Sequence, residues 1–368
     1  QMRLRRLTGL ARDELAAQIA ELHEQIAYFK DLLAHEEKIL GVIKDELHEV
    51  VEKFGTPRRT QICGREARDL DVEDLIAEED MVVTVTHSGY IKRLPVDTYR
   101  SQKRGGKGVS ALSLKENDFV EGLFVASTHD YVLFFTNFGK VYRLKVHELP
   151  VGSRQARGQA IVNLLALSEG ERLAAVITTR EFPSEEYLLF ATANGMVKKT
   201  AMSDYDRTRR DGMIAINLRE GDELIDVRRV REHEKVILVS TDGKAIMFDE
   251  SESRPMGRAT SGVRGITMKG DARLLGMEIT NGNGDLFVIT EKGYGKRTPV
   301  SEYPEHKRGG QGVFTITMTD KKGELAGMKV VAPQHELMIV SEEGIVIRMK
   351  SGDISRLGRS TQGVRVMN

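Results

Sequence analysis

The sequence predicts a mainly β protein, a propeller-like disc preceded by an α-helical segment. Three observations support this fold class. A glycine-containing hairpin pattern recurs six times after residue 80, a second glycine follows each hairpin at a nearly constant distance, and the first 54 residues follow a helical period instead. A β-rich repeat of about 50 residues is typical of a radial array of blades, because one such unit cannot bury its own faces.

Composition narrows the classes of protein. The chain has 368 residues with 55 Lys and Arg, 55 Asp and Glu, and one cysteine. Hydrophobic content of 40% is sufficient for a core. A single cysteine excludes an intramolecular disulfide scaffold and favours a reducing compartment, which we expect to be the cytoplasm. We expect no membrane span, because no apolar run approaches about 18 residues. We expect no signal peptide, because no charged leader followed by an apolar stretch is visible.

Two helices are predicted near the start of the chain. Apolar residues recur in steps of three and four over 15–33 and again over 40–54, which is the seam of a helix that packs on another helix. The two series are out of register across 34–39, so we expect a break there. Thr8 is a candidate N-cap and Gly55 a stop signal. The seam alone does not identify the surface that it packs against. The simplest interpretation is an ordinary helical hairpin.

The composition divides the chain into three parts. Residues 1–60 are the helical arm, 61–80 an acidic linker and 81–368 the β disc. An acidic run is usually a solvated face. A secondary hypothesis is that the linker competes with a polyanion for a basic surface nearby.

Each β repeat reads as a short hydrophobic strand, a turn with glycine, and a strand that carries Lys or Arg. Glycine supplies the positive φ that a tight hairpin turn needs. The turn glycines lie 48 to 56 residues apart and are Gly89, Gly139, Gly195, Gly243, Gly293 and Gly344.

The second glycine follows 19 residues later, or 17 in the third repeat, at Gly108, Gly158, Gly212, Gly262, Gly312 and Gly363. Six units of about four strands predict a closed six-bladed disc. We expect the ring to close where the strand near 81–86 meets the tail.

The loop before the second glycine of the first repeat carries three glycines and three cations. Glycines let a backbone approach a phosphate, and Lys and Arg supply charge, Arg with two parallel donors. A Walker P-loop is excluded, because Lys107 is followed by Gly instead of Ser or Thr. The alternative is a surface loop whose glycines only make a turn. The candidate phosphate-binding residues of this loop are Gln102, Lys103, Arg104, Gly105, Gly106, Lys107 and Gly108.

Weaker versions of this loop recur in the other repeats. Because equivalent loops of a ring lie on one rim, we expect their cations to form a belt that suits a long, stiff polyanion. The candidates are Arg154, Arg157, Arg209, Arg210, Arg258, Arg264, Lys307 and Arg308. Cations on the strand after each turn are expected to widen this belt, namely Lys92, Arg93, Lys140, Arg143, Lys198, Lys199, Lys296, Arg297 and Arg348.

No catalytic constellation is visible. The sequence lacks HExxH, GxSxG and paired-cysteine metal motifs, and its nine histidines are scattered. We therefore expect no catalytic residue, metal ligand or cofactor in this chain.

The motifs together resemble one protein family. The heptapeptide QKRGGKG at 102–108 resembles the signature box of the DNA gyrase A subunits, and residues 74–94 resemble the entry into the C-terminal domain of that family. Residues 6–15 and 52–60 resemble the end of its coiled-coil arm. Two lysines of the box occupy positions where arginine is commoner. The positive charge is kept, but the planar guanidinium group that can bind two phosphate oxygens at once is lost. The resemblance covers essentially the whole chain and implies a six-bladed β-pinwheel preceded by a coiled-coil arm.

This resemblance also implies a function. It implies wrapping of double-stranded DNA around a basic rim without sequence specificity, which lets an ATP-dependent type II topoisomerase introduce negative supercoils. The DNA-cleaving tyrosine is implied to lie upstream, so that this chain is a DNA-binding module. ATP and Mg²⁺ are implied to bind the gyrase B subunit. The expected partners are DNA, that B subunit and a second gyrase A subunit in an A2B2 assembly.

Three alternatives stay open. The related subunit of topoisomerase IV shares the fold and favours decatenation, but its box is degenerate and it often has fewer blades. A propeller that binds proteins through its flat face is disfavoured by an aromatic content of 6% and by the absence of Trp. A propeller enzyme is disfavoured by the lack of convergent acidic or histidine groups.

Overall fold

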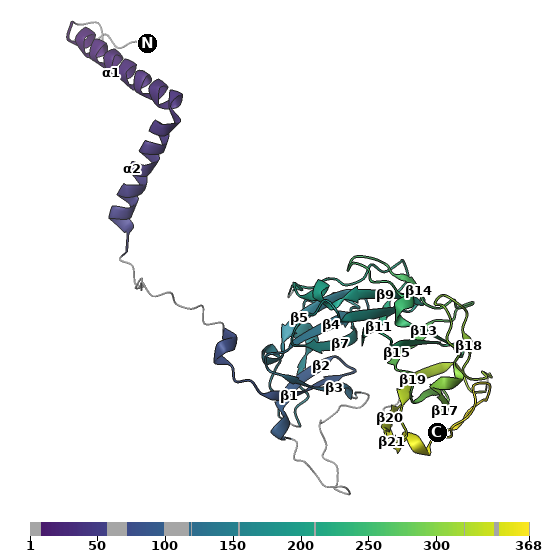
Figure 1. Cartoon of the computed structure of the whole chain (residues 1–368). Coiled ribbons are helices and arrows are strands. Elements are labelled where there is room, and N and C mark those ends of the chain that lie inside the picture. Colours follow the sequence, from purple (N-terminus) through teal and green to yellow (C-terminus); the bar gives the residue numbers. More distant parts are fainter. Residues whose placement is uncertain are drawn as a thin grey trace. The chain divides into compact units, whose positions relative to one another are not determined.

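The computed structural model describes residues 9–56, 72–98, 118, 120–153, 155–209, 211–319, 321–341 and 346–367. The chain divides into two units, Gln1–Asp69 and Leu70–Asn368. Both α-helices belong to the first unit and every strand to the second (Figure 1). Within the described part of the chain, no helix is long and apolar enough to cross a membrane.

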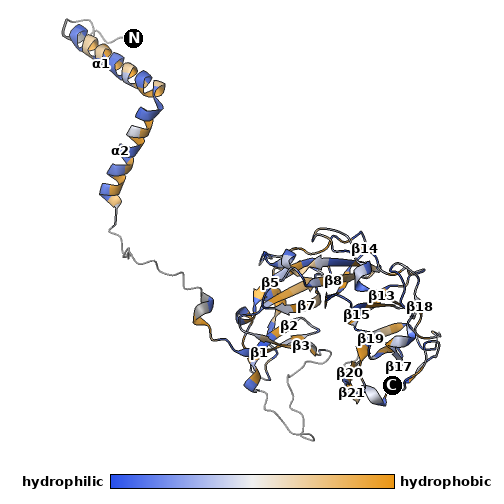
Figure 2. Ribbon diagram, viewed as in Figure 1, coloured by the Kyte–Doolittle hydropathy of each residue, from blue (hydrophilic) through white to orange (hydrophobic). Residues whose placement is uncertain are grey.

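The first unit contains the two predicted helices. α1 (Gly9–Ala34) and α2 (Glu36–Phe54) meet at His35, whose φ of −132° and ψ of 103° are extended, so the predicted break is confirmed. α2 ends directly before Gly55, as predicted. Thr8 lies outside the described residues. The apolar seam residues of both helices are 40 to 78% exposed and form visible apolar stripes (Figure 2).

All six predicted hairpins form. They are β1 (Asp80–Thr86) with β2 (Tyr90–Pro95), β4 (Tyr131–Thr136) with β5 (Lys140–Lys145), β8 (Tyr187–Thr192) with β9 (Met196–Ala201), β12 (Lys235–Ser240) with β13 (Lys244–Asp249), β16 (Asp285–Thr290) with β17 (Tyr294–Pro299), and β20 (Glu336–Val340) with β21 (Val346–Lys350). The five described turn glycines have φ between 73° and 83°, which is the conformation predicted for them.

Two further kinds of strand complete the sheets. A longer inner strand pairs with the first strand of the hairpin; these are β3 (Val120–Ser127), β7 (Leu173–Thr179), β11 (Leu224–Val230), β15 (Leu274–Thr280) and β19 (Leu325–Val331). A two-residue strand pairs with the second strand; these are β6 (Gln159–Ala160), β10 (Met213–Ile214), β14 (Val263–Arg264), β18 (Val313–Phe314) and β22 (Val364–Arg365). Each two-residue strand comes from the repeat after the hairpin that it joins, so neighbouring repeats exchange strands.

The described residues thus form five four-stranded sheets and one two-stranded sheet, β20–β21. The mainly β, propeller-like class is confirmed, whereas the count of six blades stays a prediction. The predicted ring closure is wrong. The tail strand β22 pairs with β17, and β1 already has β2 and β3 as its two neighbours. The exchange of strands explains this result, because it uses the tail to complete the fifth blade.

The core lies between successive blades. One cluster joins Val83 and Ile91 of the first sheet to Phe134 and Tyr142 of the second. The next cluster joins Phe135 to Phe190, whose ring centroids are 5.4 Å apart in an edge-to-face arrangement. The same pattern continues to the last sheet. Each blade therefore buries its faces only against its neighbours, as the repeat predicts.

Candidate nucleic-acid interface

The loops that carry the predicted cations are anchored in the same way in successive repeats. We call the segments 151–158, 205–212, 255–262, 305–312 and 356–363 the rim loops. Four of them begin at a parallel β-bridge to the second hairpin strand of the preceding blade: Val151 to Arg93, Pro255 to Lys199, Glu305 to Met247, and Arg356 to Arg297. All five end at the second glycine and continue into the two-residue strand of that blade. Each rim loop therefore arches over the outer strand of a blade.

The register of the two-residue strands is identical in the five sheets. The residue after the second glycine always pairs with the second residue of the hairpin strand. The second glycine is required by close contact. Gly158 has φ of 92°, and a Cβ there would lie 2.4 Å from the Ile91 carbonyl oxygen. Equivalent positions of the rim loops consequently lie at equivalent places on the outer edge of successive blades.

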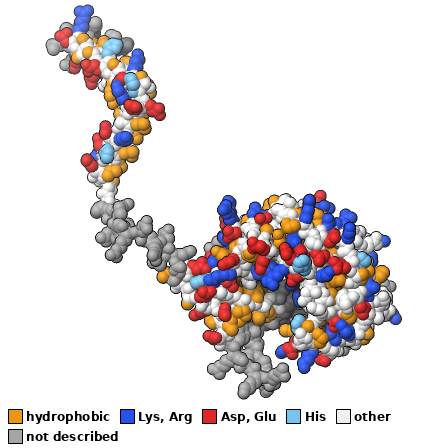
Figure 3. Space-filling model, in the orientation of Figure 1, with side chains coloured by type: hydrophobic (Ala, Val, Ile, Leu, Met, Phe, Trp, Pro, Cys, Tyr) orange, Lys and Arg blue, Asp and Glu red, His pale blue; other side chains and the backbone are white. Residues whose placement is uncertain are grey.

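Three of the predicted cations are exposed on this edge. Arg209, Arg264 and Lys307 belong to the third, fourth and fifth repeats, and Arg264 is the second residue of β14. Figure 3 shows Lys and Arg side chains projecting at several places along the outline of the propeller unit. Side chains of this type at a solvent-facing edge can bind phosphate groups.

Arg157 instead holds the fold together. Its Nη2 lies 3.3 Å from Oδ2 of the buried Asp118, and its guanidinium carbon lies 3.6 Å from the centre of the Tyr90 ring. The side chain is 24% exposed. Burial opposes the charge of Asp118, but hydrogen bonds from Ser88, Thr86 and Arg157 outweigh it and lower the pKa of that carboxyl. Arg157 therefore has an ionised partner, which limits its reach toward a ligand.

Arg308 and Arg258 also bond within the rim. Arg308 Nε donates to the Glu252 carbonyl at 2.8 Å, and its Nη1 donates to the Arg264 carbonyl at 3.3 Å. Arg258 Nη1 donates to the Asp204 carbonyl at 3.4 Å. The three acceptors lie just outside the rim loop of the preceding repeat, so these bonds tie each loop to its neighbouring repeat. The remaining predicted residues, 102–108, Arg154 and Arg210, lie outside the described residues.

The prediction that hairpin cations widen the belt is wrong for most of them. Lys92, Lys198 and Lys296 are completely buried, and Lys199 and Arg297 are 5% exposed. The rim loop of the next repeat covers these side chains, which a reading of one strand at a time does not show. The other members also bond within the fold: Arg93 to backbone carbonyls, Lys140 to Glu171, Arg143 to Asp206 and Arg348 to Glu336.

One rim cation escaped the sequence prediction. Arg365 is exposed on β22 and lies two residues after Gly363, which is the position of Arg264 relative to Gly262. The constant register after the second glycine is the signal that identifies it.

The described end of the acidic stretch pairs with cations outside the rim loops. Glu73 Oε1 lies 2.7 Å from Lys145 Nζ on β5, and Glu78 Oε1 lies 3.1 Å from Arg180 Nη1. Among the residues with described positions, no group of three or more His, Cys, Asp or Glu could hold a metal ion.

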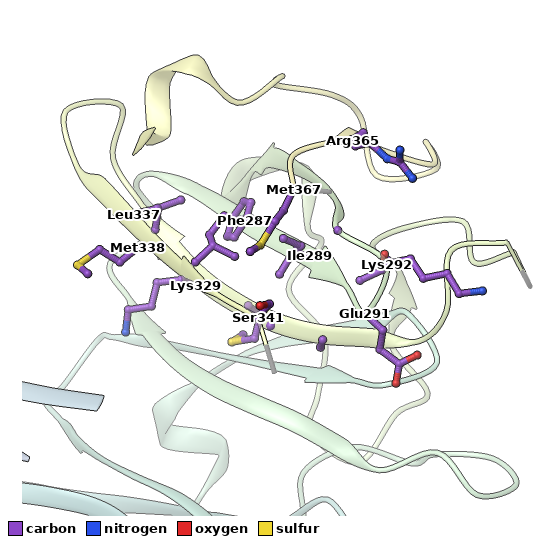
Figure 4. A pocket seen from close by; sticks show the side chains of 16 residues that line it. Phe287, Ile289, Glu291, Lys292, Lys329, Leu337, Met338, Ser341, Arg365 and Met367 are labelled. Atoms are coloured by element: carbon purple, nitrogen blue, oxygen red, sulfur yellow. The ribbon is translucent and has the colours of Figure 1, made fainter. Parts of the chain in front are cut away.

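A cavity lies beside the last hairpin, and Arg365 and Met367 of the tail help to line it. It has a volume of about 1020 Å³ and lies between β16, β19 and the β20 strand. Many of its lining side chains are apolar, and Figure 4 shows Glu291 and Lys292 pointing away from them.

Comparison with known proteins gives one consistent family. The sequence matches the family described as "DNA gyrase C-terminal domain, beta-propeller" in six stretches, residues 80–127, 130–180, 186–231, 234–281, 284–332 and 335–368. The chain is 45% identical to the DNA gyrase A subunits of Staphylococcus epidermidis and Staphylococcus aureus over its whole length. It spans 41% and 42% of those two proteins.

Solved structures of C-terminal domains from two type II topoisomerases share this fold. The crystal structure of the C-terminal domain of DNA topoisomerase IV matches with a TM-score of 0.70 at 29% identity, over 80% of this chain and 90% of that chain. The structure of a DNA gyrase A C-terminal domain matches with a TM-score of 0.63 at 29% identity, over 78% and 95% of the two chains.

Proposed function

Because the chain belongs to the family of DNA gyrase C-terminal β-propeller domains, we propose that it binds double-stranded DNA along the rim loops and wraps it. The observation that carries this proposal is the constant register that places cation-bearing loops at equivalent edges of successive blades. Phosphate contacts of this kind fix position and carry no sequence information. We infer that binding depends on DNA deformability more than on base identity.

The stiffness of DNA sets the energetic requirement. Bending 20–30 base pairs by 40–90° costs on the order of 1–6 kcal/mol. Several phosphate contacts spread around the propeller offset this cost, because each releases condensed counterions. The exposed Arg209, Arg264, Lys307 and Arg365 come from four consecutive repeats and are suited to this distributed role. The box at 102–108, with Arg154 and Arg210, is proposed to contribute to the same edge.

Within a whole gyrase, the wrap would present a neighbouring DNA segment for ATP-dependent strand passage and so give negative supercoiling. The proposed partners are the gyrase B subunit, which would bind ATP and Mg²⁺, and a second gyrase A subunit, in the cytoplasm. The DNA-cleaving tyrosine is proposed to belong to a different part of the gyrase A polypeptide. This chain would supply the DNA-binding surface.

A topoisomerase IV subunit is the second candidate, because the matched topoisomerase IV domain has the higher TM-score of the two at equal sequence identity. The backbone alone therefore does not separate the two enzymes. The 45% identity to gyrase A subunits over the full chain favours gyrase.

Salt dependence of binding tests the proposed interface. We expect the affinity of the full chain for a duplex of random sequence to fall steeply between 50 and 200 mM salt, with a log–log slope of about −3 to −6. Gel-shift or fluorescence-anisotropy titrations at several salt concentrations measure this slope. A slope near zero, or no retardation at the lowest salt, would contradict DNA binding by the rim loops.

A further inference from the structure

Three buried lysines lie directly under rim loops. Lys92, Lys198 and Lys296 each lie three residues after the turn glycine of the first, third and fifth repeats. They belong to β2, β9 and β17, and none has measurable solvent exposure. Burial of an ammonium group is costly unless it is hydrogen-bonded, so the contacts that these groups make are informative.

The ammonium groups bond to the rim loop of the next repeat. Lys296 Nζ donates to the carbonyls of Gly358 and Arg359, both at 2.7 Å, and to Thr361 Oγ1 at 3.0 Å. Lys92 Nζ donates to the carbonyls of Ala156 at 2.7 Å and Ser153 at 3.2 Å.

Lys198 Nζ donates to the carbonyls of Arg258 and Ala215. In all three cases the rim-loop acceptors lie two, four or five residues before the second glycine. The three lysines thus bond to the same stretch of the rim loop, although Lys92 and Lys198 share no acceptor position.

The carbonyl groups that accept these hydrogen bonds belong to arginines of the rim loops or to the residue before such an arginine. Lys198 holds the carbonyl of Arg258 and Lys296 holds that of Arg359, whereas Ala156 directly precedes Arg157. A charge-assisted hydrogen bond to a carbonyl restricts the backbone on both sides of it. We propose that Lys92, Lys198 and Lys296 are positioning residues that fix the rim loops in the conformation that presents their cations to the phosphates of duplex DNA. This inference rests on the proposed function.

The intervening repeats have no ammonium at this position. Tyr142 and Ile246 occupy it in the second and fourth repeats. Gly212 of the next loop packs against the Tyr142 ring, where a Cβ would lie 2.5 Å from Cε1, and Gly310 packs against Ile246. Rim loops held by a lysine therefore alternate with rim loops that rest on an uncharged side chain.

Burial makes the lysine contacts sensitive to pH near neutrality. It lowers the pKa of Lys198 to about 7, with Asp204 opposing the shift and Arg258 adding to it. It lowers the pKa of Lys296 to about 8, with Glu302 opposing and Arg359 adding. The Tyr205 hydroxyl also donates to the Ala215 carbonyl, and burial raises its pKa, so that it stays protonated over this range.

A rise in pH should change DNA affinity and the free energy of unfolding in opposite directions. Above these pKa values the charge on the lysine is lost, its bonds to the loop weaken, and DNA affinity should fall. Unfolded lysine titrates near 10.4, so between pH 7 and about 10 the unfolded chain binds more protons and the contribution of Lys198 to the unfolding free energy rises with pH. DNA affinity and stability should therefore change in opposite directions, which a purely structural lysine would not produce.

A double-mutant cycle in the full 368-residue chain tests the inference. Lys198→Met should weaken the Kd for a 40-base-pair duplex by about threefold to tenfold at pH 7 and accelerate amide hydrogen exchange at 256–262. Because Lys198 acts through the loop that leads into the exposed Arg264, Lys198→Met should add little in the Arg264→Ala background. Ile246→Met, at the same position of the fourth repeat, is the matched control and should leave affinity unchanged.

Each outcome of these experiments supports or overturns the role of Lys198. Additive losses in the cycle, or wild-type affinity in Lys198→Met, would overturn the inference. If Lys198→Met does not fold, wild-type affinity measured from pH 6.5 to 9 replaces it, and a flat profile would overturn the inference. Failure of the wild-type chain to bind DNA at low salt would instead reject the proposed function.

Discussion

At the scale of single residues, the rim loops and the two-residue strands that follow them contain two kinds of arginine. Arg209 and Arg264 are exposed, whereas Arg157 and Arg308 use their guanidinium groups to bind other parts of the fold. A free cation can contribute counterion release to DNA binding, but a cation already paired with Asp118 contributes mainly stability. The two kinds should therefore respond differently to substitution.

The exposed cations should control salt dependence. Combined substitution Arg209→Ala, Arg264→Ala and Lys307→Ala should reduce the log–log slope of DNA binding by about two to three and leave the melting temperature unchanged. Arg172→Ala, Arg180→Ala and Arg231→Ala together remove the same charge from exposed positions outside the rim loops and serve as the control. Equal slopes for the two triple variants would contradict a localised interface.

The paired arginine should control stability. Arg157→Ala leaves the carboxylate of Asp118 buried without its cation, so we expect a loss of about 1–3 kcal/mol in unfolding free energy at pH 7. The pKa of Asp118 is lowered in the folded chain, so its favourable contribution is present above pH ~4 and is lost as the pH falls further. Urea unfolding should therefore show a deficit at pH 7 that shrinks toward pH 3. A deficit independent of pH would argue against the ion pair as its cause.

At the scale of the elements, each hairpin turn is a contact point for the following repeat. Gly139 has φ of 73°, and a Cβ there would lie 2.6 Å from the Ile216 carbonyl oxygen. Its own carbonyl accepts hydrogen bonds from the amides of Ala215 and Ile216. The turn glycine therefore does more than reverse the chain, because it also joins one repeat to the next.

Substitution of this glycine should be costly for two separable reasons. Gly139→Ala should lower the unfolding free energy by about 2–4 kcal/mol, through the positive φ and through the clash. Gly221→Ala, with φ of 71° and nothing within 4 Å, should show only the conformational part, about 1 kcal/mol. Chemical denaturation compares the two variants, and equal losses would refute the role of the contact with Ile216.

The sequence predicted the hairpins and helices well because their signals are local. Hairpin glycines recur with one period, and the change of register near His35 marks the helix break. The exchange of strands was not predictable in this way, because β22 and the other outer strands are two residues long and carry no periodicity. Their partners lie in another repeat, so only the folded chain shows them.

The candidate site was predictable only in part for a related reason. The position of the rim loops follows from the two glycine markers. Exposure of individual cations does not, because a lysine such as Lys198 in a strand gives no sign of the loop that covers it. Conversely, Arg365 was overlooked, although its place after the second glycine is equivalent to that of Arg264.

At the scale of the whole propeller unit, contacts between neighbours hold the blades. Hydrophobic clusters join each sheet to the next. Two ion pairs join the inner strands β11, β15 and β19 of three successive sheets. Glu278 Oε1 lies 3.3 Å from Arg228 Nη2 and 2.6 Å from Lys329 Nζ. These contacts keep adjacent rim loops at a fixed spacing, which a surface that bends stiff DNA requires.

The change in DNA topology on binding is the sharpest check of wrapping along the rim loops. A nicked plasmid is sealed by ligase in the presence of increasing amounts of the full chain, the protein is removed, and the linking-number distribution is measured. We expect a shift of one sign that grows with the amount of bound chain, is lost with Arg209→Ala, Arg264→Ala and Lys307→Ala, and persists in the control triple variant. Saturated binding with no linking-number shift, or an equal shift from both triple variants, would contradict it.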